Sequence, residues 1–117
     1  MRAMVRAMLE QAGYEVMEAH EGRTGMHQHQ ETPADVILLD LFMAGQEGLE
    51  TIRALRRVDP QVKIIAISGG GGVGNPQAYL HLAMMLGAQR TLQKPFSRLE
   101  LLDAVQDMMQ RGSATGC

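Results

Sequence analysis

The sequence predicts an α/β fold in which helices cover a parallel β-sheet. Segments with helical and with strand-like hydrophobic spacing alternate along the 117 residues, and this alternation is typical of strand–helix–strand crossovers. Residues 36–39 are apolar without interruption, as in a strand that is buried on both faces of a parallel sheet. Such connections are right-handed, so the strands should run side by side in one direction.

Length and composition predict a single domain. With 45% apolar and 21% charged residues, the chain has a globular balance, and we assign residues 1–111 to the domain and 112–117 to a flexible tail. The net charge of −2 argues against direct nucleic-acid binding. No apolar run reaches the length of a membrane span and no leader pattern is evident, so we expect a soluble, cytoplasmic protein. The single cysteine, Cys117, excludes an internal disulfide and a cysteine-based metal site.

The first third of the chain should form a helix, a strand and a weaker helix. Apolar residues recur at helical spacing over residues 1–12, and Gly13 follows where a left-handed cap is expected. Residues 14–19 alternate between apolar and polar side chains, which predicts a short strand. Residues 22–31 have weak helical periodicity and end before Pro33.

The rest of the chain repeats the strand–helix pattern. Pro60 ends one helix, Asn75 and Pro76 open the next, and Ser97 with Glu100 forms a capping box for the last. With residues 14–19, the prediction contains four strands. The remaining elements are expected as a strand at 36–39, a helix at 49–58, a strand at 63–67, a helix at 76–86, a strand at 90–93 and a helix after Ser97.

Polar residues follow three of the predicted strands at the point where each strand ends. Asp40, Ser68 and Lys94 should therefore meet at the carboxyl edge of the sheet, where open α/β sheets gather their functional groups. A carboxylate there can attack phosphorus and form an acyl phosphate, with Lys94, the Ser68 hydroxyl and the backbone N–H of Gly69 neutralising the phosphoryl oxygens. Each residue alone is more simply read as the end of a strand, and only their joint placement favours a site.

Four short motifs, in order and suitably spaced, resemble the receiver domain of two-component response regulators. The resemblance extends to about residue 111. The motifs are Val36-Ile37-Leu38-Leu39-Asp40-Leu41-Phe42-Met43, Ala66-Ile67-Ser68, Gly87-Ala88 and Lys94-Pro95-Phe96.

The resemblance implies a flavodoxin-like doubly wound sheet and a signalling role. Asp40 would accept a phosphoryl group from a histidine kinase or phosphotransfer protein, and Ser68 and Lys94 would contact that group. Asp40 and the main-chain oxygen of Phe42 would hold Mg²⁺, and the Lys94-Pro95 bond would be cis. The chain would not be an enzyme, and phosphorylation would change its affinity for a downstream protein through the helical surface near residues 79–91.

Three departures from the receiver pattern matter. The family begins with a strand that ends in an acidic pair, and this sequence starts inside the helix that follows it, so Mg²⁺ binding should be weak or absent. Ala44 stands where relatives have a proline, and Thr91 stands where they often have an aromatic switch residue. The alternative is therefore a pseudo-receiver, which has lost phosphorylation and acts as a protein-binding or dimerisation module.

The missing strand would leave an apolar slot between residues 14–19 and 36–39. Three outcomes stay open: the two strands pair directly, two chains share surfaces as a homodimer, or the sequence starts inside a longer natural chain. Unless the gap is closed, we expect lowered stability and association.

Other features have simpler explanations. His27 and His29 could chelate a metal only from an extended backbone, and a solvated polar face, which would include His20, is favoured. The glycines of residues 69–72 lack the Lys-Ser/Thr of a nucleotide phosphate loop. The methionine pairs at 84–85 and 108–109 are expected to fill the core.

Overall fold

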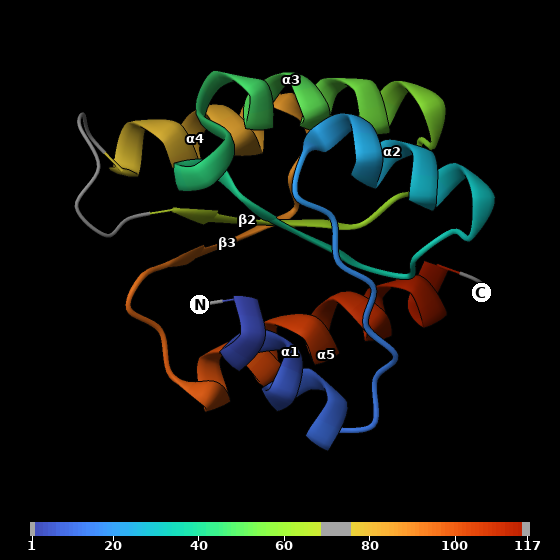
Figure 1. The fold of residues 1–117 in the computed structure, drawn as a ribbon, viewed down its shortest axis with the longest axis vertical. Helices are drawn as coiled ribbons and strands as arrows, with labels where there is room; N and C mark the ends of the chain where they lie inside the picture. Colours follow the sequence, from blue (N-terminus) through green and yellow to red (C-terminus); the bar gives the residue numbers. More distant parts are fainter. Residues whose placement is uncertain (1, 69–75, 116–117) are drawn as a thin grey trace.

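The computed structural model describes residues 2–68 and 76–115, which form a parallel sheet between two layers of helices (Figure 1). Figure 1 shows α2, α3 and α4 on one side of the sheet, and α1 and α5 on the other. The elements in chain order are α1 (Arg2–Gln11), α2 (Gly22–Glu31), β1 (Ile37–Asp40), α3 (Leu41–Val58), β2 (Ile64–Ser68), α4 (Pro76–Leu86), β3 (Arg90–Gln93) and α5 (Arg98–Thr115).

The sheet has the order β1-β2-β3, and both pairs of neighbouring strands are parallel. All five residues of β2 are buried, because β2 is central and has helices on both faces. Its alternate side chains enter two hydrophobic clusters. Ile65 and Ile67 pack with α1 and α5, whereas Ile64 and Ala66 pack with α3 and α4. The predicted α/β parallel architecture is confirmed.

The strand predicted at residues 14–19 is absent, so the sheet has three strands within the described residues and not four. The predicted alternation of buried and exposed side chains is present. Tyr14 and Val16 are partly buried against the hydrophobic cluster that includes α1 and α5, while Glu15 and Met17 are exposed. Alternation determines which side chains face the core, but a strand also needs a neighbouring backbone to bond. No strand of the described chain lies beside this segment, and it stays irregular.

Helix α3 begins at Leu41, directly after β1, and not at residue 49 as predicted. The apolar periodicity starts only at Leu49, which is why the earlier residues are read as a loop. However, no proline lies between Leu41 and Val58, and Ala44 is a strong helix former. The helix can therefore start as soon as the strand ends.

The last helix is also longer than expected. Helix α5 continues to Thr115, so much of the tail predicted for residues 112–117 is helical, and residues 116–117 lie outside the described part. Its start is as predicted, because Ser97 Oγ accepts from Glu100 N at 3.1 Å and Glu100 Oε1 accepts from Ser97 N at 3.0 Å. This reciprocal pair satisfies backbone donors at the helix start.

Two long side chains join the loops on the amino-end side of the sheet. The side-chain amide of Gln89 bonds to the backbone at the start of β2 as a neighbouring strand would. Its oxygen accepts from Ile64 N at 2.8 Å, and its nitrogen donates to Val62 O at 3.0 Å. Arg56 on α3 donates to Pro60 O at 2.7 Å and to Gly87 O at 2.6 Å. Gly87 ends α4 with φ +132°, a conformation that favours glycine, and its carbonyl thereby faces Arg56.

Within residues 2–68 and 76–115, no helix has both the length and the apolar character that a bilayer crossing requires.

Candidate functional site

Asp40, Ser68 and Lys94 lie at one edge of the sheet, as the sequence predicts. Asp40 is the last residue of β1, Ser68 is the last of β2, and Lys94 follows the last residue of β3. The strand register places Asp40 beside Ile67, and Ser68 beside Gln93. Because the strands are parallel, their carboxyl ends form a single rim.

The amine of Lys94 reaches across the end of β2 to the carboxylate of Asp40. Lys94 Nζ lies 2.7 Å from Asp40 Oδ2, and both side chains are less than one-fifth exposed, at 18% and 17%. The backbone supports this geometry, since Lys94 N donates to Ser68 O at 2.8 Å. The Lys94–Pro95 peptide bond is cis, as the resemblance implies. The rim therefore holds a carboxylate beside a fixed positive charge.

Ser68 contributes a hydroxyl group from the buried central strand. Its residue is only 4% exposed, so the backbone of β2 fixes its position. Thr91 lies on β3 beside Ala66, further from the rim, and is partly buried. Gly69, the predicted backbone donor to a phosphoryl group, lies outside the described residues.

The described residues do not fit a Mg²⁺ site at this rim. Phe42 lies in the first turn of α3, where a carbonyl oxygen is directed along the helix axis toward the amide four residues later. The Asp40 carboxylate already accepts a hydrogen bond from Lys94. No three His, Cys, Asp or Glu side chains of residues 2–68 and 76–115 are grouped so as to hold a metal ion. Mg²⁺ prefers six oxygen ligands, and the described residues of this rim supply too few.

The histidines are arranged differently from the predicted solvated face. His27 is exposed and pairs with Glu31 at 3.1 Å, but His29 is only 5% exposed. His29 Nε2 lies 2.9 Å from Asp59 Oδ2, and His29 Nδ1 accepts from Ala34 N at 3.0 Å. The hydrogen bond from His29 lowers the pKa of Asp59. His27 and His29 therefore have separate partners and form no chelate.

This histidine–aspartate pair is the polar contact that sequence reasoning missed. It joins the end of α2 to the turn after α3, two segments that are 30 residues apart. The only feature of the sequence that indicates a buried His29 is its position near the end of α2, a helix whose other face is polar. That signal does not identify a partner so far along the chain.

The comparisons with known proteins agree with this fold. The family model described as the response regulator receiver domain matches residues 1–106. The chemotaxis protein CheY of Thermotoga maritima is 32% identical over 106 residues, which cover 90% of this chain and 85% of that protein. The response regulator receiver protein CpdR of Brucella abortus is 30% identical over 110 residues, covering 93% of this chain and 88% of that protein.

Solved structures support the same architecture. A CheY-like response regulator receiver domain protein from Methanospirillum hungatei superimposes with a TM-score of 0.84 at 20% identity, covering 97% of this chain and 88% of that one. The chain belongs to the response regulator receiver family, and its fold is the flavodoxin-like α/β fold of that family.

Proposed function

We propose that this receiver domain accepts a phosphoryl group on Asp40 from the phosphohistidine of a histidine kinase or phosphotransfer protein, and regulates a partner protein. The observation that carries the proposal is the 2.7 Å contact between Lys94 Nζ and Asp40 Oδ2 at the carboxyl edge of the sheet. A partly buried carboxylate with a fixed cation beside it is suited to a reaction in which charge develops on phosphoryl oxygens.

The transfer forms one bond and breaks one bond. A carboxylate oxygen of Asp40 attacks the phosphorus atom, the P–N bond to the donor histidine breaks, and the imidazole nitrogen keeps the electron pair. Lys94 then faces an acyl phosphate instead of a carboxylate, and its ammonium group can follow the added negative charge. In this proposal, the Ser68 hydroxyl donates to a phosphoryl oxygen from the neighbouring strand.

The surface for the partner is proposed on α4. Leu82, Met84 and Met85 are 43%, 46% and 70% exposed, so the prediction that Met84 and Met85 fill the core is wrong, and together the three side chains form an exposed apolar patch. Helix α4 lies between β2 and β3 in the chain, so its position depends on the strand that ends at Ser68 and on the strand that directly precedes Lys94. A change at the rim can therefore alter the packing of α4. The proposal also assigns the chain to the cytoplasm, where a kinase has access to ATP.

The proposal is tested by labelling the purified chain with phosphoramidate and measuring its intact mass. We expect a minor fraction to gain one phosphoryl group, because the described part of the rim holds the carboxylate and the cation but too few ligands for a metal ion. Asp40→Asn should abolish the label. Asp35→Asn, which removes an exposed carboxylate just before β1, should leave the label unchanged.

Two results would overturn the proposal. If the wild-type chain stays unlabelled after prolonged incubation, the pseudo-receiver alternative is correct and the domain acts by binding alone. If Asp40→Asn retains the label, the acceptor is a different residue. A circular dichroism melt of each variant shows whether loss of label reflects loss of fold.

A further inference from the structure

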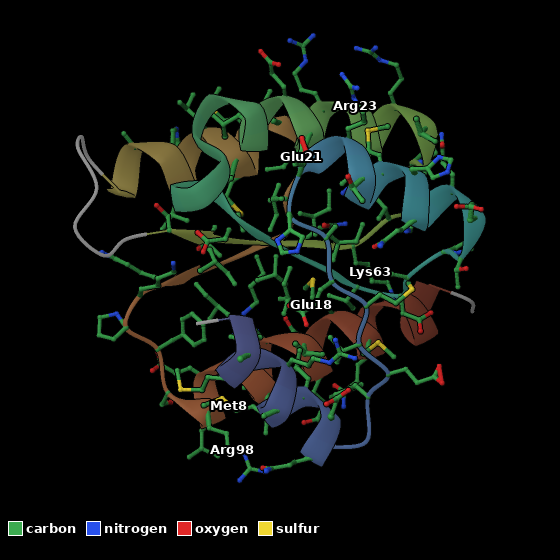
Figure 2. All side chains as sticks on the ribbon, viewed as in Figure 1. Met8, Glu18, Glu21, Arg23, Lys63 and Arg98 are labelled. Atoms are coloured by element: carbon green, nitrogen blue, oxygen red, sulfur yellow. The ribbon has the colours of Figure 1, made fainter. Side chains whose placement is uncertain are left out.

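Arg56 on α3 joins the two loops that lead into β2 and β3, on the side of the sheet opposite the rim. Its guanidinium group donates to Pro60 O at 2.7 Å through Nη1 and to Gly87 O at 2.6 Å through Nη2. Pro60 lies just beyond the end of α3, and Gly87 directly follows α4. Lys63, labelled in Figure 2, directly precedes β2 and marks this side of the sheet. The Arg56 side chain therefore ties the carboxyl ends of two neighbouring helices together.

The contact between Arg56 and Gly87 is close enough to require a glycine. Gly87 has φ +132°, a backbone conformation that residues with a Cβ rarely adopt. A Cβ at this position would lie 3.0 Å from Arg56 Nε and 3.5 Å from Arg56 Cγ. The arginine side chain thus lies directly against the glycine backbone, and any larger residue would displace it.

Further hydrogen bonds hold the backbone that follows α4. Gly87 N and Ala88 N both donate to Ala83 O, at 3.1 and 2.9 Å. Gln89 N donates to Ile64 O at 3.0 Å, and the Gln89 side chain makes two more bonds to the backbone at the start of β2. Residues 87–89 are therefore bonded to α4, to α3 and to the central strand.

The rest of α4 is held by apolar packing. Its amino end, Pro76, follows the carboxyl end of β2 in the chain and lies toward the rim (Figure 1). The described side chains within α4 are apolar apart from His81, which is exposed. Leu80 and Ala83 are buried in the cluster with α3 and β2. Because apolar packing is non-directional whereas hydrogen bonds need a fixed geometry, the two ends of α4 are attached in different ways.

Asp59 shapes the turn that holds Pro60 within reach of Arg56. Its Oδ1 accepts from Gln61 N at 3.1 Å, and its Oδ2 lies 2.9 Å from His29 Nε2. The hydrogen bond from His29, and to a smaller extent the positive charge of Arg56, lower the pKa of Asp59. The carboxylate therefore fixes the turn on one side and stabilises the guanidinium group on the other.

We propose that α4 is hinged at Gly87: Arg56 fixes the carboxyl end of the helix, Asp59 positions Arg56, and displacements of α4 occur at its rim end. A hinge needs only a few residues at the end of an element to absorb the change in backbone angles, and Gly87 is suited to this. The hinge tilts α4 as a unit and does not shift it along the sheet. It is a property of the folded chain and does not depend on phosphorylation of Asp40.

Amide hydrogen exchange of the full chain, followed residue by residue by NMR, tests the hinge. A protection factor compares the exchange rate of an amide with its rate in an unfolded chain. In the wild type, we expect the protection factor of Ala88, at the anchored end, to exceed that of Leu80, nearer the rim, by at least about tenfold. A protection factor of Leu80 equal to or above that of Ala88 would overturn the proposal.

Two matched substitutions on α3 test the role of Arg56. Arg56→Met removes both hydrogen bonds, and Arg57→Met makes the same change at the next residue, which is exposed. Arg56→Met should lower the protection factor of Ala88 by about tenfold and leave that of Leu80 unchanged, because opening at the rim end does not break the Arg56 contact. Arg57→Met should change neither. An equal fall at both amides would show that α4 opens as one unit, and an equal effect of Arg57→Met would show that only the charge matters; either result overturns the proposal.

A milder substitution keeps the test valid if Arg56→Met does not fold. Arg56→Lys retains the positive charge, but its single nitrogen cannot occupy the positions of both Nη1 and Nη2. We expect the protection factor of Ala88 to fall by at least about threefold and that of Leu80 to stay the same. An unchanged protection factor of Ala88 would show that the paired hydrogen bonds are not the anchor, and would overturn the proposal.

The positioning role of Asp59 is tested by a double-mutant cycle. Asp59→Ala removes the acceptor for Gln61 N and should lower the protection factor of Ala88 by about threefold. In the Arg56→Met chain, the same substitution should have no further effect on Ala88, because Asp59 acts through Arg56. Asp35→Ala, at an exposed carboxylate, is the control and should leave Ala88 unchanged in both chains. An undiminished effect of Asp59→Ala in the Arg56→Met chain would overturn the assignment of Asp59.

Discussion

Lys94 donates a hydrogen bond to Asp40 at 2.7 Å although the two residues are 54 positions apart in the chain. The contact spans the full width of the sheet, because β1 and β3 lie on either side of β2. It therefore depends on the correct register of both strand pairs. With each side chain less than one-fifth exposed, neither charge can be fully hydrated if the other is removed.

This pair should show strong energetic coupling. Lys94→Gln leaves the Asp40 carboxylate partly buried without its cation, so we expect the free energy of unfolding to fall by about 1–3 kcal/mol in urea titrations. Asp40→Asn/Lys94→Gln removes both charges and should recover part of that loss. Lys63→Gln, a change of the same kind away from the rim, serves as control. A double variant with the summed losses of the single variants would contradict the coupling.

Mg²⁺ should have little effect on labelling of this chain. Because the rim residues that the structure describes supply too few oxygen ligands for an octahedral ion, the initial rate of labelling by phosphoramidate should be the same with Mg²⁺ and with EDTA. A receiver that carries the family's acidic pair, measured in parallel, supplies the positive control.

A gain of function extends this experiment. Adding a strand that ends in two aspartates before Met1 should make the labelling Mg²⁺-dependent, and Asp40→Asn in that extended chain should abolish it. Stoichiometric Mg²⁺-dependent labelling of the unextended chain would contradict the prediction.

The pair of His29 and Asp59 should contribute stability that is lost in acid. The hydrogen bond from His29 holds the pKa of Asp59 below its ordinary value of 3.8, so the unfolded chain takes up this proton more readily than the folded chain. The contribution is complete above the unfolded pKa and disappears as the pH falls through the folded pKa. Between about pH 5 and pH 3, the free energy of unfolding should therefore fall more steeply in the wild type than in Asp59→Asn.

Urea titrations across that pH range give the measurement, and Asp35→Asn is the matched control because Asp35 is an exposed carboxylate. His29→Gln should reduce the acid-dependent loss in the same way as Asp59→Asn. Parallel pH profiles for the wild type and both variants of the pair would show that the contact does not contribute to the acid dependence.

The rim could be predicted because it depends on local pattern. Asp40 and Ser68 each end an apolar run, and parallel strands bring such ends together whatever the details of packing. The irregular segment of residues 14–19 could not be predicted, because side-chain alternation is a local property whereas backbone pairing needs a neighbour. The burial of His29 has the same cause: it depends on Asp59, a partner from a distant turn.

Sequence alone also does not show which glycine of a helix lies against a distant residue, and two glycines of α2 allow a direct comparison. Gly22 and Gly25 lie in this one helix, and their sequence surroundings do not distinguish them. In the structure, a Cβ at Gly22 would collide with Thr51 Oγ1 on α3, whereas a Cβ at Gly25 would only contact Ala19 Cβ at an ordinary 3.5 Å. Gly22 therefore permits the close approach of α2 to α3, and Gly25 has no such role.

The two alanine substitutions should consequently have opposite signs. Gly25→Ala should raise the free energy of unfolding by about 0.5–1 kcal/mol, because alanine loses less backbone entropy in a helix. Gly22→Ala should lower it by about 1–3 kcal/mol, since α2 must shift away from Thr51 or Thr51 must leave its buried position. Thr51→Ala in the Gly22→Ala background removes the clashing oxygen and should restore part of the stability. Urea titrations of the wild type, the two single variants and the double variant measure the free energies of unfolding. A stabilising Gly22→Ala would show that α2 does not pack on Thr51 as closely as described.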